Sequence, residues 1–529
     1  MIYFFKYILL TGFLLMIQSH LFADKPRLVI GIMIDGLQKS HVEQLRTRFG
    51  QDGLRKICFG GAAINRVECN IVSAGNTSDI TTLMTGTVPY YHGITGNSVF
   101  NRMNASTTPV FEDKNQSGIE TNLKLSAFNM KTTSLLDELM FTYPDRSKSY
   151  VVAIQPEDAI AMGGHTADGV VWINDATQKW STTTYYSKGL PWQAMDMNSN
   201  NSFVRHGGTV WTPLYNPDTY LSSPGRRSTR SFEYMPNDRK PGQTASWIRN
   251  TPAANALVSE LALRIVNEEK LGTDIYPDLL MLQYTVRTPD EKKFSLQSME
   301  KEDMYLRLDG EIQFLMQKIE SWINPADVLF FVFGNQTNAR SPEELKENNI
   351  YAGYFNAGRS LALLNSYLIA MYGQEKWVDG YHNKNIYLNK KKIEEKNLNM
   401  NDFLRNVASF MSEFEGIQSA LTYRDILNQP VTLMNEQSRI RNSTYKNSAG
   451  DIVLTMMPGW IEVNDKGETV GESSSLVPEI PFYFYGWNIQ TQTVFAPCSI
   501  TDLAPTICNF LSVPAPNGNI GRAIEIQLK

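Results

Sequence analysis

An acidic residue follows the first strongly apolar run of the chain. Residues 27–34, RLVIGIMI, are rich in β-branched and apolar side chains, as in a buried parallel strand, and Asp35-Gly36 comes directly after them. In open α/β sheets, ligands bind beyond the carboxyl ends of the strands. A carboxylate at that point can ligate a metal ion or form a turn, and spacing alone favours the turn.

Metal chemistry at such a position depends on how many other ligands the chain offers. The 529 residues include only 6 His and 4 Cys, which limits the number of zinc sites and excludes a disulfide-built scaffold. Cys58 and Cys69 are close in sequence, as are Cys498 and Cys508, and their connectivity stays open. A helix starting near Ile500 would strain a bond between the last two.

The overall composition excludes some classes of partner. The chain has 49 Lys and Arg against 54 Asp and Glu, a formal net charge of −5, so it lacks the basic field of a nucleic-acid-binding protein. A hydrophobic fraction of 42% is enough for a sizeable core.

The N-terminus has the pattern of an export signal. Lys6 precedes an almost wholly apolar stretch at 8–17, and the small residue Ala23 precedes a charged segment. The apolar stretch falls short of the roughly 20 residues that span a bilayer. We therefore predict a signal peptide at 1–23 and a mature chain, 24–529, that is periplasmic or extracellular and has no transmembrane segment.

Strand-like runs alternate with amphipathic segments along most of the mature chain. This alternation predicts an α/β fold with a mostly parallel central sheet and helices on both faces. Two stretches, about 173–242 and about 341–465, lack the alternation and are predicted to be insertions that form a cap or lobe on one core. Besides 27–34, the predicted strands are 149–155, 278–284, 328–333 and 481–485, and the predicted helices are 253–269 and 299–323.

Residues 85–97, TGTVPYYHGITGN, resemble a signature of the alkaline phosphatase superfamily. More narrowly, they are similar to bacterial phosphate-irrepressible alkaline phosphatases and their type I phosphodiesterase and nucleotide pyrophosphatase relatives. The resemblance covers nearly the whole mature chain and implies an alkaline-phosphatase-like fold that hydrolyses phosphate esters with two zinc ions and a Thr or Ser nucleophile. Further segments similar to family landmarks follow in family order at 163–168, 277–280, 302–309, 500–506 and 516–521.

The resemblance also locates zinc-ligand positions that this chain does not keep. The family supplies its ligands as an Asp after the first strand, Asp-x-x-x-His, Asp-His and a late His, and neither of the two paired patterns occurs anywhere in this chain. Thr288 and Lys292 stand at the Asp-x-x-x-His positions, Asn335 follows Gly334 where the Asp-His pair is expected, and Glu479 replaces the late His. Asp35 and Glu479 are therefore the candidate metal ligands.

The positions implied for nucleophilic attack and phosphate binding are also altered. By the family's spacing Asn76 occupies the nucleophile position, and an amide cannot attack phosphorus usefully. The nearby hydroxyls Ser73 and Thr77 are alternatives, but a hydroxyl in such a loop is more often a helix cap, and Thr77 or Ser78 could cap the following helix. Asn97 matches the family's substrate-binding residue.

The phosphate clamp and the histidines also depart from the family pattern. The family's Lys-x-Arg clamp falls at 155–157, Gln-Pro-Glu, where a carboxylate would repel phosphate. No histidine falls at a zinc position, and His92 and His165 are expected to make structural hydrogen bonds.

The sequence thus predicts an exported pseudo-phosphatase that binds a small-molecule ligand or an envelope protein, with no cofactor expected. The alternative is an active metal-dependent phosphoric ester hydrolase with Asp35, Glu479 and Asp79 around one cation, which would be zinc, and Ser73 or Thr77 as nucleophile. A third hypothesis is a partner or glycan surface built from the aromatic residues of the first insertion, Tyr185, Tyr186, Trp192 and Trp211.

Overall fold

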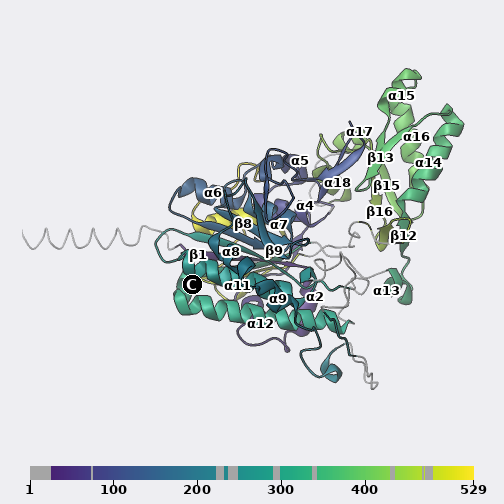
Figure 1. Cartoon of the computed structure of the whole chain (residues 1–529). Helices are drawn as coiled ribbons and strands as arrows, with labels where there is room; N and C mark the ends of the chain where they lie inside the picture. Colours follow the sequence, from purple (N-terminus) through teal and green to yellow (C-terminus); the bar gives the residue numbers. More distant parts are fainter. Residues whose placement is uncertain are drawn as a thin grey trace, which may run out of the picture.

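The computed structural model describes most of the mature chain (Figure 1). The predicted signal peptide lies outside the described residues, as do Ser73, Lys292 and Glu479. No helix among the described residues is long and apolar enough to cross a membrane. The described ranges are 25–72, 75–221, 231–235, 248–289, 298–335, 342–428, 435–467, 470 and 480–529.

The apolar runs form the middle of one large sheet whose strand order is β19-β2-β18-β11-β1-β10-β7-β8-β9-β6. β1 pairs in parallel with β10 and β11, and β7 pairs in parallel with β10 and β8. All five predicted strands are present, and the predicted α/β class is confirmed. In sheet order the bounds are Gln492–Val494, Ala62–Ile64, Phe482–Gly486, Val328–Gly334, Leu28–Asp35, Asp278–Thr285, Ser149–Ala153, Gly169–Asn174, Lys179–Thr183 and Gly118–Ile119.

Helices cover both faces of this sheet because alternate side chains of its strands enter two separate cores. Val29 and Met33 of β1 lie in one core, whereas Ile30 and Ile32 lie in the other. On the first face are α4 (Asn76–Thr85), α6 (Leu135–Thr142), α7 (Pro156–Gly163) and α19 (Leu503–Leu511). On the second are α2 (Lys39–Leu45), α3 (Leu54–Gly60), α11 (Pro252–Glu268) and α12 (Met299–Trp322). The last two are the predicted helices.

The first predicted insertion begins later than expected, because position 173 lies inside β8 and β9 still belongs to the main sheet. Beyond them, α8 (Trp192–Ser199) and α9 (Ser202–Gly207) pack against α11. The aromatic residues of this stretch do not share one exposed face: Trp211 is buried and its Nε1 donates to Asp303 at 2.7 Å, while the hydroxyl of Tyr186 donates to the carbonyl of Gly164.

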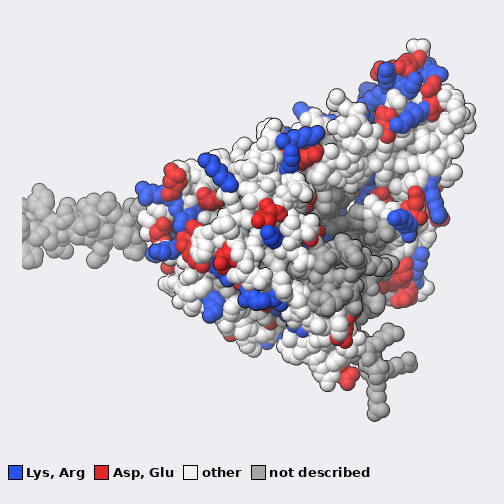
Figure 2. Space-filling view, in the orientation of Figure 1, with Lys and Arg blue, Asp and Glu red and all other residues white. Residues whose placement is uncertain are grey.

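The second predicted insertion forms a lobe with its own sheet and core. The sheet order is β13-β14-β16-β15, and α14, α15 and α16 lie beside it (Figure 1). On the face shown in Figure 2, charged side chains of both signs are interspersed and gather at the tip of the lobe near α15, so no broad basic patch appears there. The lobe elements are β13 (Val378–His382), β14 (Asn385–Leu388), β15 (Ile417–Thr422), β16 (Ile452–Met456), α14 (Ala357–Tyr372), α15 (Lys390–Glu395) and α16 (Met400–Ser412).

The structure also contains further short helices and strands outside the main sheet and the lobe sheet. They are β3 (Val67–Glu68), α5 (Pro89–His92), β4 (Ser98–Asn101), β5 (Ser106–Pro109), α13 (Pro342–Glu347), β12 (Gly353–Asn356), α17 (Tyr423–Asn428), α18 (Glu436–Asn442), β17 (Trp460–Val463) and β20 (Cys498–Ser499). All four cysteines are buried free thiols, and Cys508 lies on α19, the helix anticipated after Ile500.

Candidate functional site

The carboxyl ends of β1, β10 and β11 meet at one edge of the sheet. Asp35, the last residue of β1, stands opposite Thr285 of β10, and Ile34 stands opposite Gly334 of β11. Asn335 follows β11 directly, so its side chain reaches the same edge. Asp35 is 5% exposed, and its carboxylate therefore needs buried partners.

Both oxygens of the Asp35 carboxylate are bound within the protein. Oδ2 accepts a hydrogen bond from Nε of Arg287 at 2.7 Å, which is also an ion pair. Oδ1 accepts from Nδ2 of Asn335 at 2.8 Å, and Oδ1 of Asn335 accepts from the Gly36 amide at 3.0 Å. A guanidinium thus neutralises the carboxylate at the position where the family pattern places a metal ion.

The same asparagine connects Asp35 to the family's nucleophile position. Nδ2 of Asn335 also donates to Oδ1 of Asn76 at 2.6 Å. Asn76 is the first residue of α4, and its side chain lies near enough to Asp158 to lower the pKa of that carboxyl group. Gln283 of β10 donates to Oδ2 of Asp158 at 2.6 Å. The side chains form one polar chain along the sheet edge, which we call the edge network: Arg287, Asp35, Asn335, Asn76, Asp158 and Gln283.

Burial decides the charge state at the far end of the edge network. Asp158 is 2% exposed, and desolvation raises its pKa well above the usual range. The nearby Asp35 and Glu157 carboxylates raise the pKa of Asp158 further, while the hydrogen bonds from Gln283 and Asn76 lower it. Asp158 therefore holds a proton more readily than an exposed aspartate.

The expected clamp positions carry no cation. Gln155 follows β7, and its backbone amide donates to Oε1 of Gln283 at 2.9 Å. Its side-chain oxygen accepts from Arg249, a residue that also pairs with Asp175. Burial raises the pKa of Glu157, and Arg249 lowers it. Arg249 thus already makes a hydrogen bond with Gln155 and an ion pair with Asp175.

Asn97, the second residue that matches the family, stabilises the start of α4. Its Oδ1 accepts from the Thr77 amide at 3.3 Å. The preceding Gly75 has φ 129° and is the N-cap, and a Cβ there would come within 2.5 Å of Oδ1 of Asn97. A glycine is needed for both reasons.

The predicted hydroxyl alternatives are only partly described. Thr77 is fully buried inside α4, and within the described residues its Oγ1 has no hydrogen-bond partner. The expectation that Thr77 or Ser78 caps this helix is wrong, because the helix begins one residue earlier. Asp79 is 0% exposed and also lies within α4. Ser73 and Glu479 lie outside the described residues.

The residues around Asp35 do not form a typical zinc site. Within the described ranges, no group of three or more His, Cys, Asp or Glu is arranged to hold a metal ion. Among the described residues, the side-chain partners of Asp35 are a guanidinium and an amide, and Thr288, at the predicted ligand position beyond β10, is a buried hydroxyl. Zinc prefers imidazole, thiolate and carboxylate ligands, so the described donor set does not fit it.

His92 and His165 make structural hydrogen bonds, as predicted. His92 is fully buried; its Nε2 lies 3.0 Å from Oγ1 of Thr82 and its Nδ1 accepts from the Ile94 amide. Desolvation lowers the pKa of His92 to about 3. His165 contacts the hydroxyl of Tyr185 and the carbonyl of Thr132.

Sequence reasoning did not identify Arg287, Asp158, Gln283 or Arg249. The sequence does carry a signal for Arg287, because this residue follows the predicted strand 278–284 by three residues. It therefore belongs to the sheet edge at which ligands bind in this class of fold. Gln283 lies inside a predicted buried strand, and a polar side chain in such a run requires a buried partner. Only the fold reveals that this partner is Asp158.

Curated proteins similar to this chain extend over nearly its whole length. A protein named calcium-transporting ATPase from Myroides odoratus is 25% identical over 519 residues, covering 95% of this chain and 94% of that protein. Alkaline phosphatase PafA from Elizabethkingia meningoseptica is 24% identical and covers 94% of each chain. Alkaline phosphatase PhoV from Synechococcus elongatus is 24% identical, covering 96% of this chain and 93% of the relative.

The fold and a family model agree with these similarities. The crystal structure of PafA superimposes with a TM-score of 0.86 at 24% identity, covering 95% of this chain and 99% of that chain. The model of the Type I phosphodiesterase / nucleotide pyrophosphatase family matches residues 29–477. Since this match takes in the sheet edge and the lobe alike, the chain belongs to the Type I phosphodiesterase / nucleotide pyrophosphatase family, within the alkaline phosphatase superfamily.

Proposed function

We propose that this protein is an exported, non-hydrolytic member of its family that acts by binding. The observation that carries the proposal is the pairing of Asp35 with Arg287 and Asn335. A cation at Asp35 would have to displace the guanidinium, and removing one partner from a buried ion pair costs about 3–5 kcal/mol. The protein's own side chains thus compete with metal for its one matching ligand.

The nucleophile position supports the same conclusion. Asn76 has no ionisable hydroxyl, and its amide oxygen is already bonded to Asn335. Attack on phosphorus requires an oxygen that loses its proton to a base or a metal. The amide instead helps to hold α4 against the sheet edge.

Charge at the sheet edge also disfavours a phosphate dianion. Asp158 lies beside Asn76, Glu157 lies near Asp158, and Arg249 is paired with Asp175. Phosphoryl transfer needs donors and cations aimed at the developing negative charge. Here the neighbouring carboxylates would either repel the substrate or be protonated.

An active hydrolase remains the second candidate because curated relatives are named alkaline phosphatases. The decisive experiment measures metal and turnover together. The purified mature chain is incubated with zinc, desalted and analysed by mass spectrometry for bound metal. It is then assayed with p-nitrophenyl phosphate and bis-p-nitrophenyl phosphate, which report monoesterase and diesterase activity.

We expect the wild-type chain to bind no stoichiometric zinc. Any residual turnover should be the same in the wild-type chain and in Asp35→Ala. Two tightly bound zinc ions, with turnover lost in Asp35→Ala, would establish the hydrolase instead. Export is tested separately by cell fractionation and N-terminal sequencing, with Asp24 expected as the first residue of the mature chain.

A further inference from the structure

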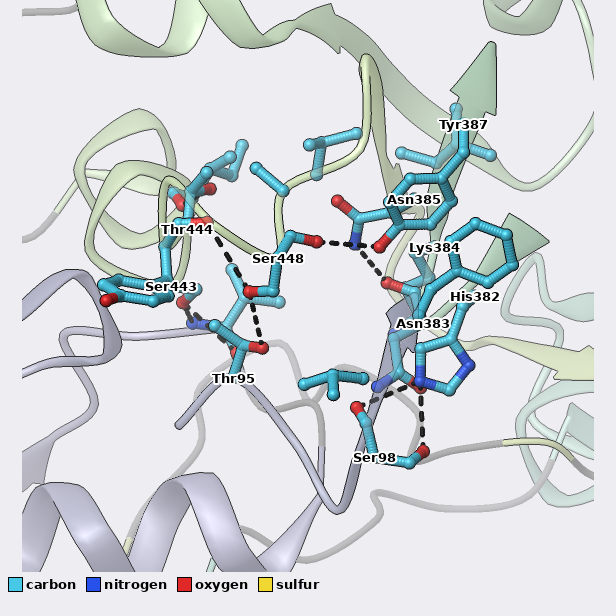
Figure 3. A pocket seen from close by; sticks show the side chains of 18 of the residues that line it. Thr95, Ser98, His382, Asn383, Lys384, Asn385, Tyr387, Ser443, Thr444 and Ser448 are labelled. Carbon is cyan, nitrogen blue, oxygen red and sulfur yellow. Dashed lines mark hydrogen bonds between the residues drawn. The ribbon is translucent and has the colours of Figure 1, made fainter. Parts of the chain in front are cut away.

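A second cavity lies apart from the sheet edge, between the β4 region and the lobe. Its volume is about 90 Å³, measured as space open to the centres of water molecules, and Ser98 on one side faces His382 on the other (Figure 3). One water needs roughly 10–15 Å³ by this measure, so several waters or one small organic molecule can fit. Ser98 directly follows Asn97, but the cavity wall is otherwise made largely by the lobe.

The cavity has two walls that are fixed to each other. Arg102, the residue that directly follows β4, donates two hydrogen bonds to the Asp451 carboxylate, at 2.8 and 3.1 Å. Oγ1 of Thr95 lies 3.2 Å from Oγ of Ser448 across the same boundary. The Asp451 side chain is 4% exposed and that of Arg102 is 36% exposed, so this attachment is partly buried. The cavity is therefore preformed, which reduces the entropy lost when a ligand binds.

Opposite charges line this cavity. Glu462 on β17 is 7% exposed, and burial raises its pKa, while Lys384 lowers it. Lys384 lies in the turn between β13 and β14, on the cavity wall. Among the described lining residues these two are the Glu and the Lys, and the third ionisable side chain of this kind, His382, lies with its Nε2 3.0 Å from Oγ of Ser98, where burial lowers its pKa. The described part of the lining thus offers one acidic and one basic side chain.

The Tyr387 ring in the lining is not open for stacking on a sugar. Carbohydrate sites offer an aromatic face for stacking. Tyr387 is stacked on Phe100 with ring centroids 4.2 Å apart, and the Arg102 guanidinium lies 4.7 Å from the Tyr387 centroid. Phe100 and Arg102 thus already pack on this ring. Val453 of β16 supplies an apolar surface instead, whereas the side chain of the next residue, Leu454, packs in the core of the lobe.

We propose that this cavity binds a small zwitterion, an α-amino acid with an apolar side chain. Its ammonium group pairs with Glu462, its carboxylate faces Lys384, and its side chain packs against Val453. This assignment deepens the proposed binding function by naming a ligand class. It does not depend on the sheet edge being inactive, because it uses none of the edge-network residues.

The test is calorimetric titration of the full mature chain with L-leucine and three analogues. N-acetyl-L-leucine lacks the ammonium charge, L-leucine methyl ester lacks the carboxylate, and glucose lacks both charges. We expect binding of L-leucine at micromolar to millimolar concentration and at least about tenfold weaker binding of each analogue. Undetectable binding of L-leucine, or equal binding of the ester and the free amino acid, overturns the assignment.

Variants connect the binding to the two charges. Glu462→Gln and Lys384→Met should each weaken L-leucine binding by about tenfold or more. The exposed Glu413→Gln and Lys376→Met on the same lobe are the matched controls and should leave the affinity unchanged. Circular dichroism melting checks that each variant is folded. Unchanged affinity in a folded Glu462→Gln variant refutes the proposed site, whereas metal and turnover measurements bear only on the sheet edge.

Discussion

The Arg287–Asp35 pair is the contact whose removal is most informative. The two side chains are 16% and 7% exposed, so the pair is largely desolvated. Breaking a buried pair by removing one partner costs about 3–5 kcal/mol. Because Asn335 still donates to the other oxygen of Asp35, we expect Arg287→Met to lower the free energy of unfolding by about 3 kcal/mol, near the lower end of that range.

A double-mutant cycle separates the pair from the rest of the edge network. Arg287→Met, Asp35→Asn and the double variant are unfolded in urea at neutral pH, and we expect a coupling energy of about 2 kcal/mol. Arg66 and Glu68 form the matched control, an ion pair at 2.9 Å whose side chains are 58% and 20% exposed. Its coupling should stay below about 1 kcal/mol. A coupling at Asp35 no larger than that of the control would refute the idea that Arg287 neutralises a buried carboxylate in place of a metal ion.

Three further changes test other parts of the structure. Burial raises the pKa of Asp158, so the folded state favours the protonated carboxyl group. The free energy of unfolding should therefore fall as the pH rises from the unfolded pKa through the folded pKa of this group. Asp158→Asn should reduce this loss in urea unfolding between about pH 4 and pH 9, and an unchanged pH dependence would contradict the assignment. Gly75→Ala should destabilise the chain by about 1–3 kcal/mol, because its Cβ would meet an amide oxygen at 2.5 Å with φ at 129°, whereas Gly189→Ala, with nothing within 4 Å, should change the melting temperature little. Arg102→Met should loosen the lobe and so increase amide hydrogen exchange in β13 and β14. The control is Lys390→Met, which removes a more exposed partner of the same Asp451 carboxylate and should increase exchange less. Equal exchange in the two variants would count against Arg102 as the main attachment.

The pattern of apolar residues was sufficient to predict the framework. Five strands and two helices were predicted because buried parallel strands and amphipathic helices each impose a periodicity on the chain. The start of the first insertion was misplaced because β9, with Lys179 and three hydroxyl residues, resembles a surface segment although it extends the main sheet. Propensity is weak at such positions, where pairing with a neighbouring strand decides the structure.

The sequence by itself determined which patterns this protein lacks, since the order of residues shows that Asp-His and Asp-x-x-x-His are absent, and the family resemblance predicts Asn76 at the nucleophile position. Only the tertiary structure decided what takes their place. Asp35 is separated by 252 residues from Arg287 and by 300 from Asn335, and the three meet because β1, β10 and β11 run parallel and end at one edge. A short-range pattern cannot encode that meeting, because it depends on strand order and register, which the packing of the whole sheet determines.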